Sequence, residues 1–168
     1  MGSRGSVIPL FLEKAKKGIL PITDPKMTRF NITLEKAAEL LEIKDKVIFV
    51  GKVSNDLIPA YLNSSDIFVR ASRSEGLGIS FIEAMAAGVP VIGPNVGGIP
   101  DLISDGKTGL LCKPEDPADL ANKISALVSK PELASKIVKQ SKQMVEDNFN
   151  WDKISSQINK SFSTLVKQ

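Results

Sequence analysis

Four short apolar runs, separated by helical or turn-like segments, constrain the fold of this chain most strongly. They occupy residues 47–50, 67–69, 89–92 and 109–112. Continuous apolar runs of this length are typical of strands that are buried on both faces of a parallel sheet. The alternation predicts an α/β domain with right-handed crossovers, in which helices flank a parallel sheet of about four to five strands.

Helices are expected on either side of these strands. Residues 33–41 have the apolar spacing of a short helix, with Thr33 as its N-cap. Further along, Asp116 is expected to cap a helix that begins with Pro117. A second helix begins near Pro131, and a last one follows Asn150.

Composition limits the chemistry that is available. The chain has 168 residues, a net charge of +3, no histidine and one cysteine, Cys112, which is expected in a buried strand. Without histidine, serine–histidine triads and the common histidine metal sites are excluded, and one cysteine cannot form a disulfide framework. The lysines are dispersed, which argues against nucleic-acid binding. Catalysis would have to use carboxylates, lysine, arginine, hydroxyls or backbone dipoles.

The chain has no membrane-spanning pattern. No apolar stretch approaches the ~18 residues that are needed to cross a bilayer, and no secretory signal is visible. The expected location is the cytoplasm, with peripheral association at the inner membrane face as an alternative.

Residues 72–90 carry the most chemical information, because a strand end, a glycine-rich turn and a helix start follow one another directly. Gly76 and Gly78 allow a ligand to approach the backbone closely. The helix that follows, expected at about residues 78–87 and stopped by Gly88, points unpaired N–H groups at the turn. A diphosphate would be stabilised there without a metal.

Two carboxylates flank this turn. Glu75 lies just before the helix and Glu83 lies eight positions later, inside it. Carboxylates suit ligands that are rich in hydroxyl groups, because they accept hydrogen bonds in pairs. On spacing alone, Glu75 could equally be a charge at a helix N-terminus, and Glu83 a solvated helix residue.

The sequence EGLGISFIEAMAAGVPVIG, followed by GGIPDLISDGKTGLL and PEDPADLANKISALV, resembles the C-terminal, donor-binding domain of the group 1 retaining glycosyltransferases of GT-B architecture. The resemblance covers residues 41–162, and the E-x7-E element with its flanking glycines is the most specific part. It implies an incomplete Rossmann-like GT-B C-terminal domain. The substrate it implies is a nucleotide-diphosphate sugar, with no cofactor and no metal.

The resemblance also implies roles for individual residues. Glu75, as the catalytic residue, would contact hydroxyls of the donor sugar, and Glu83 would contact the ribose. The backbone amides of Gly76, Leu77 and Gly78 would approach the sugar and the diphosphate.

Three further donor-binding candidates are less specific. Lys52 and Val53 follow the strand at 47–50, in a turn that lies near the base in the family. Arg73 could reach a phosphate, although an exposed arginine that only increases solubility would have the same sequence pattern. Arg70 is another basic residue near the predicted site.

The chain also departs from the family. The first two strands of the donor domain and the acceptor-binding domain have no counterpart. The family pattern GR-x4-KG, which supplies positive charge to the leaving diphosphate, is absent. We therefore expect a hexosyltransferase by ancestry that is inactive alone.

Residues 1–40 instead resemble an internal segment of the nucleotide-sugar 4,6-dehydratases, again enzymes of polysaccharide biosynthesis. Neither the dinucleotide glycine motif nor the Tyr-x3-Lys pair is present, so dehydratase activity is not implied. We predict two parts, a dehydratase-like segment at 1–40 and a donor-binding domain at 41–168. Residues 19–23 are expected to cover an exposed sheet edge.

Three hypotheses remain open: a glycosyltransferase polypeptide, a non-catalytic sugar-nucleotide-binding module or subunit, and a nonfunctional fusion remnant. The first two would require a separate acceptor-binding domain or a homodimer as partner. Dimerisation is suggested by an apolar patch, expected to be exposed, of Phe149, Trp151, Ile158 and Phe162. The base, the sugar and the acceptor are not indicated by the sequence.

Overall fold

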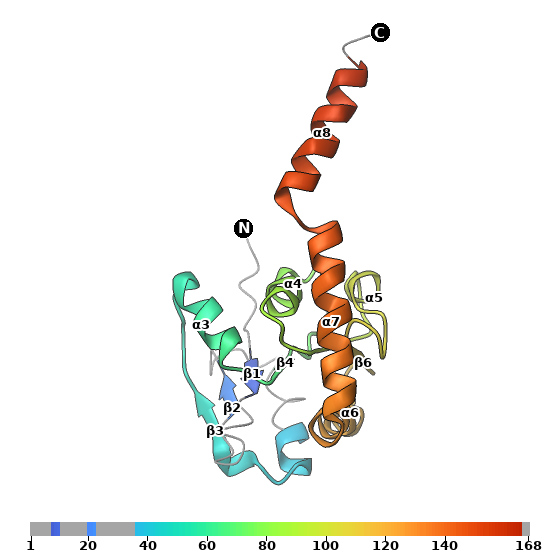
Figure 1. Ribbon diagram of the computed structural model, residues 1–168. Helices are drawn as coiled ribbons and strands as arrows, with labels where there is room; N and C mark the ends of the chain where they lie inside the picture. Colours follow the sequence, from blue (N-terminus) through green and yellow to red (C-terminus); the bar gives the residue numbers. More distant parts are fainter. Residues whose placement is uncertain (1–7, 11–19, 23–35, 166–168) are drawn as a thin grey trace.

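The computed structural model describes residues 8–10, 20–22 and 36–165 (Figure 1). A four-stranded sheet has the order β1, β4, β5, β6, and a two-stranded sheet pairs β2 with β3. The strand bounds are β1 Ile8–Leu10, β2 Leu20–Ile22, β3 Val47–Phe49, β4 Ile67–Val69, β5 Val91–Pro94 and β6 Leu110–Cys112.

Strands β4, β5 and β6 are parallel, whereas β1 runs antiparallel to β4. The expectation of about four to five parallel strands in one sheet is therefore wrong. The main sheet has three parallel strands and one antiparallel strand. The run predicted at residues 47–50 forms β3, but β3 pairs with β2 in the second sheet. It cannot pair with β4, because residues 8–10 already occupy that edge.

The two sheets meet where β1 and β2 lie in contact (Figure 1). Across both sheets the strands follow one another as β3, β2, β1, β4, β5, β6, but the antiparallel β1 and the break between β1 and β2 distinguish this arrangement from the continuous parallel sheet of doubly wound folds. Pro9 and Pro21 stand at the centres of β1 and β2. Because proline has no N–H to donate, a ladder between these two strands is disfavoured, and none joins them among the described residues.

The strand that covers the edge of β4 is thus β1. The sequence predicted that residues 19–23 would cover an exposed sheet edge, and Leu20–Ile22 does pair with a predicted strand, β3, although not with β4. No strand was predicted at residues 8–10.

Helices follow the strands much as expected. Their bounds are α3 Ile58–Asn63, α4 Ile79–Ala86, α5 Ile99–Leu102, α6 Pro117–Ser129, α7 Pro131–Asn148 and α8 Trp151–Leu165. Residues 36–40 are also helical, while the predicted N-cap Thr33 lies outside the described residues. Asp116 caps α6 as predicted, because its Oδ1 accepts from the Asp119 amide at 2.9 Å. Within the described part of the chain, no helix combines the length and apolarity that crossing a bilayer requires.

Both faces of the main sheet are buried. In β4, Ile67 and Val69 pack with residues of α6 and α7, whereas Phe68 packs on the opposite side with residues of α4 and α5. The ring of Phe68 meets that of Phe81 edge to face, with centroids 5.2 Å apart. This arrangement explains why the predicted strands are apolar throughout rather than alternating.

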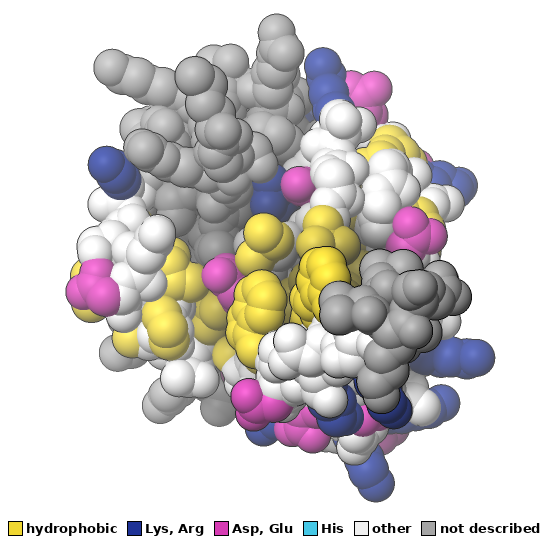
Figure 2. All heavy atoms as spheres, turned by 90° about the horizontal axis from the view of Figure 1, so that it is seen from above, with side chains coloured by type: hydrophobic (Ala, Val, Ile, Leu, Met, Phe, Trp, Pro, Cys, Tyr) yellow, Lys and Arg dark blue, Asp and Glu magenta, His cyan; other side chains and the backbone are white. Residues whose placement is uncertain are grey.

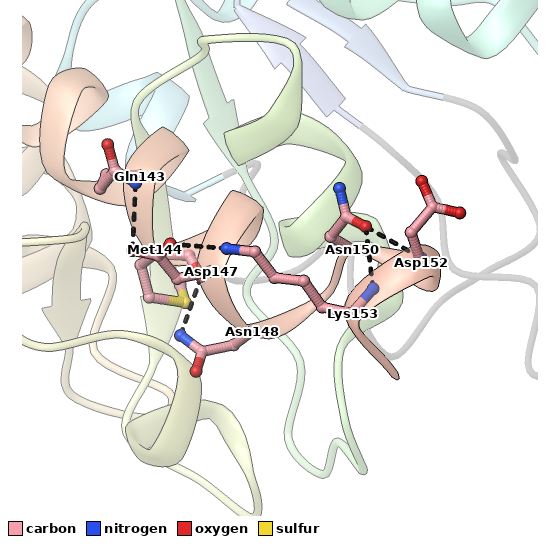
Figure 3. A network of polar contacts seen from close by, with 7 residues as sticks. All are labelled: Gln143, Met144, Asp147, Asn148, Asn150, Asp152 and Lys153. Carbon is pink, nitrogen blue, oxygen red and sulfur yellow. Dashed lines mark hydrogen bonds and ion pairs between the residues drawn. The ribbon is translucent and has the colours of Figure 1, made fainter. Parts of the chain in front are cut away.

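The last two helices meet at a polar junction (Figure 3). Asn150 caps α8, since its Oδ1 accepts from the amides of Asp152 and Lys153 at 2.9 and 3.3 Å. Lys153 Nζ lies 2.9 Å from Asp147 Oδ1 on α7. Beyond this junction α8 projects away from the rest of the chain (Figure 1).

The three apolar residues of α8 that were predicted to be exposed are exposed. Trp151, Ile158 and Phe162 are 79%, 49% and 63% exposed. Phe149 departs from the prediction, because it is only partly exposed and packs against the core cluster around Phe68.

Candidate functional site

The site begins where β4 ends. The buried strand is followed by Arg70, by the loop of residues 71–78 and then by α4, as the sequence predicted. Gly78 is the N-cap of α4 and has a φ of 70°. A Cβ there would lie 2.8 Å from Ile99 Cδ1 and 2.9 Å from Phe81 Cδ2, so both conformation and space require glycine.

The helix ends as predicted at a glycine. Gly88 has a φ of 77°, and the amide of Val89 donates to the carbonyl of Ala84 at 2.9 Å. This is the Schellman arrangement of a helix C-terminus. It limits α4 to eight residues and returns the chain directly to β5.

A second loop, between β5 and α5, supports the first. Gly98 N–H donates to the carbonyl oxygen of Glu75 at 3.3 Å. A Cβ on Gly97 would overlap that oxygen, and a Cβ on Gly98 would overlap the carbonyl oxygen of Gly76. The two loops therefore touch backbone to backbone, at the carboxyl ends of two neighbouring parallel strands.

Glu75 forms a buried ion pair. Its Oε2 lies 2.6 Å from Arg70 Nη2, and the two side chains are 8% and 10% exposed. The Ser72 hydroxyl donates to the same oxygen at 3.3 Å. No hydrogen bond or ion pair to Oε1 is found among the described residues, so this oxygen remains available to accept from a ligand.

The other guanidinium nitrogens of Arg70 are also engaged. Nε donates to Ser72 Oγ at 3.1 Å, and Nη1 donates to Ser80 Oγ in the first turn of α4 at 2.9 Å. Burial lowers the pKa of Arg70 from its ordinary value, while the charge of Glu75 acts in the opposite direction. Because all three nitrogens have partners within the chain, Arg70 is committed to holding the loop.

Glu83 lies on the exposed side of α4, four residues after Ile79. Desolvation raises the pKa of its carboxyl above the ordinary value. The exposed apolar side chains of Leu77 and Ile79 lie at the start of the same helix. In the described part of the chain, Glu83 has no ion pair, and it makes no contact with Glu75 that would fix the two carboxylates relative to each other.

The remaining predicted residues lie elsewhere. Arg73 pairs with Glu115 at 2.5 Å, in a pair whose side chains are more than half exposed. Lys52 is exposed and Val53 half-buried in the turn after β3, a strand of the two-stranded sheet. The structure therefore links Arg70, Glu75 and Gly98 directly, but gives no link from them to Lys52 or Arg73.

Ser72, Ser80 and the pair Gly97–Gly98 were not predicted as site residues. The sequence held one signal for the serines, an arginine directly after a fully apolar strand, since a buried arginine needs hydrogen-bonding partners nearby. Gly97 has a φ of 52°, and consecutive glycines after a strand indicate close backbone approach.

The face seen from above in Figure 2 shows hydrophobic side chains gathered near its centre, with acidic side chains among them.

Among the described residues, no group of three or more cysteine, aspartate or glutamate side chains is arranged to hold a metal ion.

The comparison with known families decides which kind of domain this is. Residues 30–144 match the family described as Glycosyl transferases group 1. The chain belongs to this family. Residues 1–58 match a second family, described as Polysaccharide biosynthesis protein. The recognition of a group 1 glycosyltransferase C-terminal half with a polysaccharide-biosynthesis segment before it is confirmed, and the two matches overlap over residues 30–58.

Individual relatives agree with this family match. N-acetyl-alpha-D-glucosaminyl L-malate synthase of Bacillus anthracis is 37% identical over 125 residues, which are 74% of this chain and 32% of that enzyme. The C-terminal domain of the group 1 protein LpcC of Francisella tularensis is 30% identical, with a TM-score of 0.61 over 70% of this chain and 61% of that one. Anabaena HepE, solved with UDP and glucose, is 26% identical, with a TM-score of 0.66 over 76% and 34%. The chain spans about a third of the length of the curated relatives it matches.

Proposed function

We propose that this group 1 glycosyltransferase chain binds a nucleoside-diphosphate sugar where the loops after β4 and β5 meet. The observation that carries the proposal is the contact of Gly97–Gly98 with Glu75–Gly76, which holds a buried carboxylate at the carboxyl ends of two parallel strands. Ligands of open α/β sheets bind at this end.

The surroundings of Glu75, Glu83 and residues 76–78 support a role in donor binding for each of them. Oε1 of Glu75 accepts from a hydroxyl of the donor sugar, and the exposed carboxylate of Glu83 accepts from the ribose. The amides of Gly76, Leu77 and Gly78 lie beside the N-terminus of α4, where a diphosphate is stabilised by the helix dipole. Lys52 and Val53 remain candidates for contact with the base.

Binding is the activity that we assign to the chain, and glycosyl transfer is the further step that its family suggests. Transfer requires positive charge beside the leaving diphosphate. Arg70 is fully engaged with Glu75 and two serines, and Arg73 pairs with Glu115. Both arginines thus already have partners within the chain, which favours a sugar-nucleotide-binding role over transfer by these residues alone.

The first test is calorimetric titration of the full chain with UDP-glucose and UDP, and in parallel with GDP-mannose and GDP. UDP-glucose is the first probe because HepE was solved with UDP and glucose. The test variant is Glu83→Gln, which removes the charge without changing the shape. Glu146→Gln is the matched control, because Glu146 is an exposed carboxylate on α7.

Loss of one charged hydrogen bond should weaken binding by about tenfold or more in Glu83→Gln. Glu146→Gln should bind as the unaltered chain does. Absence of binding to all four ligands would contradict the proposal, as would equal affinities in the two variants. Release of free sugar or a glycosylated product from UDP-glucose would extend it to catalysis.

A further inference from the structure

We propose that Arg70 is a positioning residue, which fixes the carboxylate of Glu75 so that a single oxygen, Oε1, is presented to a hydroxyl of the donor sugar. This inference rests on the proposed function and deepens it. It assigns the sugar selectivity of the site to a residue that does not touch the ligand.

The guanidinium of Arg70 joins three pieces of the chain. The Arg70 side chain starts from the residue that directly follows β4. Its guanidinium contacts Ser72 and Glu75 in the loop, and Ser80 in the first turn of α4. The contacts are 2.6 to 3.1 Å long, as expected of charge-assisted hydrogen bonds. A planar guanidinium that is held at all three nitrogens cannot rotate without breaking several of these hydrogen bonds.

Glu75 is held by this arrangement at one oxygen only. Oε2 accepts from both Arg70 and Ser72, which fixes the plane of the carboxylate. The backbone of the same residue is fixed from the other side, by the amide of Gly98. A ligand hydroxyl therefore meets an acceptor that is already oriented, so that less rotational freedom is lost on binding.

Charge gives Arg70 a second effect on the same site. An unpaired carboxylate close to a diphosphate would repel it, and the repulsion would be strong where water is excluded. Arg70 offsets the charge of Glu75 while leaving Oε1 as a hydrogen-bond acceptor. The site can then recognise a sugar hydroxyl next to an anionic group.

A purely structural ion pair is the alternative, and it has a different signature. If Arg70 only supported the loop, its replacement would weaken UDP and UDP-glucose binding by the same factor. If it positions Glu75 for the sugar, the ratio of the two dissociation constants changes. The charge effect on the diphosphate is common to UDP and UDP-glucose, so the ratio isolates the contact with the glucose.

The test is therefore the ratio of the dissociation constants for UDP-glucose and UDP, measured on the full chain for Arg70→Met, Arg70→Lys and Glu75→Gln. We expect the ratio to rise about tenfold in Arg70→Met and in Glu75→Gln, because the loss at the glucose comes in addition to any change in diphosphate affinity that the altered charge causes for both ligands. Arg70→Lys keeps the charge but not the planar geometry, so it should recover part of the loss.

Arg70→Met leaves a carboxylate buried without its partner and can fail to fold. Ser80→Ala is the second variant, because it frees one nitrogen of Arg70 and leaves the ion pair in place. We expect a smaller rise of the ratio in Ser80→Ala, about twofold to fivefold for a neutral acceptor.

The outcomes separate the two proposals. An unchanged ratio in Arg70→Met, or in Ser80→Ala where Arg70→Met does not fold, overturns the positioning role while nucleotide binding stands. An unchanged ratio in Glu75→Gln would show that Glu75 does not contact the glucose, and it would overturn this inference. Failure of the unaltered chain to bind UDP or UDP-glucose overturns the proposed function and the inference together.

Discussion

The amide of Gly98 donates a hydrogen bond to the carbonyl oxygen of Glu75, at 3.3 Å, across the two loops that follow β4 and β5. The contact is between backbones, because neither Gly97 nor Gly98 has a side chain to separate them. The position of the proposed donor-binding carboxylate is thus set partly by a loop more than 20 residues further along the chain.

Gly98→Ala should therefore destabilise the domain and displace Glu75. The φ of Gly98 is −83°, which alanine adopts readily, so the effect comes from overlap of the new Cβ with the carbonyl oxygen of Gly76. We expect a loss of about 1–3 kcal/mol in the free energy of unfolding, as for other overpacked sites. Urea unfolding measures it.

Gly76→Ala is the matched control on the opposite side of the same contact. A Cβ on Gly76 would meet no atom within 4 Å. The free energy of unfolding should then change by less than about 1 kcal/mol. Equal destabilisation by the two alanines would show that space between the loops does not determine stability.

The middle of the fold could be predicted from the sequence because its signals are local. Runs such as residues 67–69 are apolar throughout and must be buried on both faces. Asp116 with Pro117, and Gly88 after α4, mark helix ends through backbone chemistry that depends only on neighbouring residues. These elements are found where they were predicted.

The sheet order was not predictable in the same way. Which strand covers the edge of β4 depends on pairing between residues 8–10 and 67–69, almost 60 positions apart, and residues 8–10 are too short a run to show any periodicity. The network around Glu75 was missed for a similar reason. Ser72 and Ser80 gain their role only because Arg70 is buried between them.

Removal of residues 1–22 tests the contribution of β1 and β2. Without β1, the backbone N–H and C=O groups of β4 that now pair with it are left open at a sheet edge. We expect a lower Tm and a concentration-dependent increase in size, measured by thermal unfolding and by sedimentation. A shortened chain that stays monomeric with an unchanged Tm would mean that β1 is dispensable.

Cys112 should be inert towards alkylating reagents in the folded chain. The residue is 3% exposed in β6, and burial raises the pKa of its thiol to about 11. At pH 8 the thiol is therefore protonated as well as covered, and only the thiolate reacts. Labelling by iodoacetamide at pH 8 should follow global unfolding and become rapid in denaturant. Fast labelling without denaturant would contradict the buried position.

Nucleotide affinity should depend on the ionisation of Glu83. Desolvation raises the pKa of this carboxyl above 4.5, so it begins to take up a proton at a higher pH than an ordinary glutamate. The ionised form accepts more strongly from the ribose than the protonated form does, and the affinity for UDP-glucose should fall as the pH decreases through the pKa of Glu83. Titrations with UDP-glucose from pH 7 downwards measure this fall, which should be absent in Glu83→Gln. A decline of equal size in that variant would assign the pH dependence to another group.

The exposed face of α8 predicts self-association. Trp151, Ile158 and Phe162 repeat at the spacing of one helix face, and about half or more of each residue is exposed. The helix that carries them projects from the domain (Figure 1). Such a face is stabilised by burial against an equivalent face, because apolar area contributes roughly 25 cal/mol per Å² when it leaves water. We expect the full chain to form dimers at micromolar concentration and Phe162→Glu to remain monomeric. Ser156→Glu is the control, since it adds the same charge to an exposed position of the same helix that lies outside the hollow lined by Ile158 and Phe162. Sedimentation equilibrium distinguishes these outcomes. A chain that is monomeric at all concentrations would contradict self-association through this face.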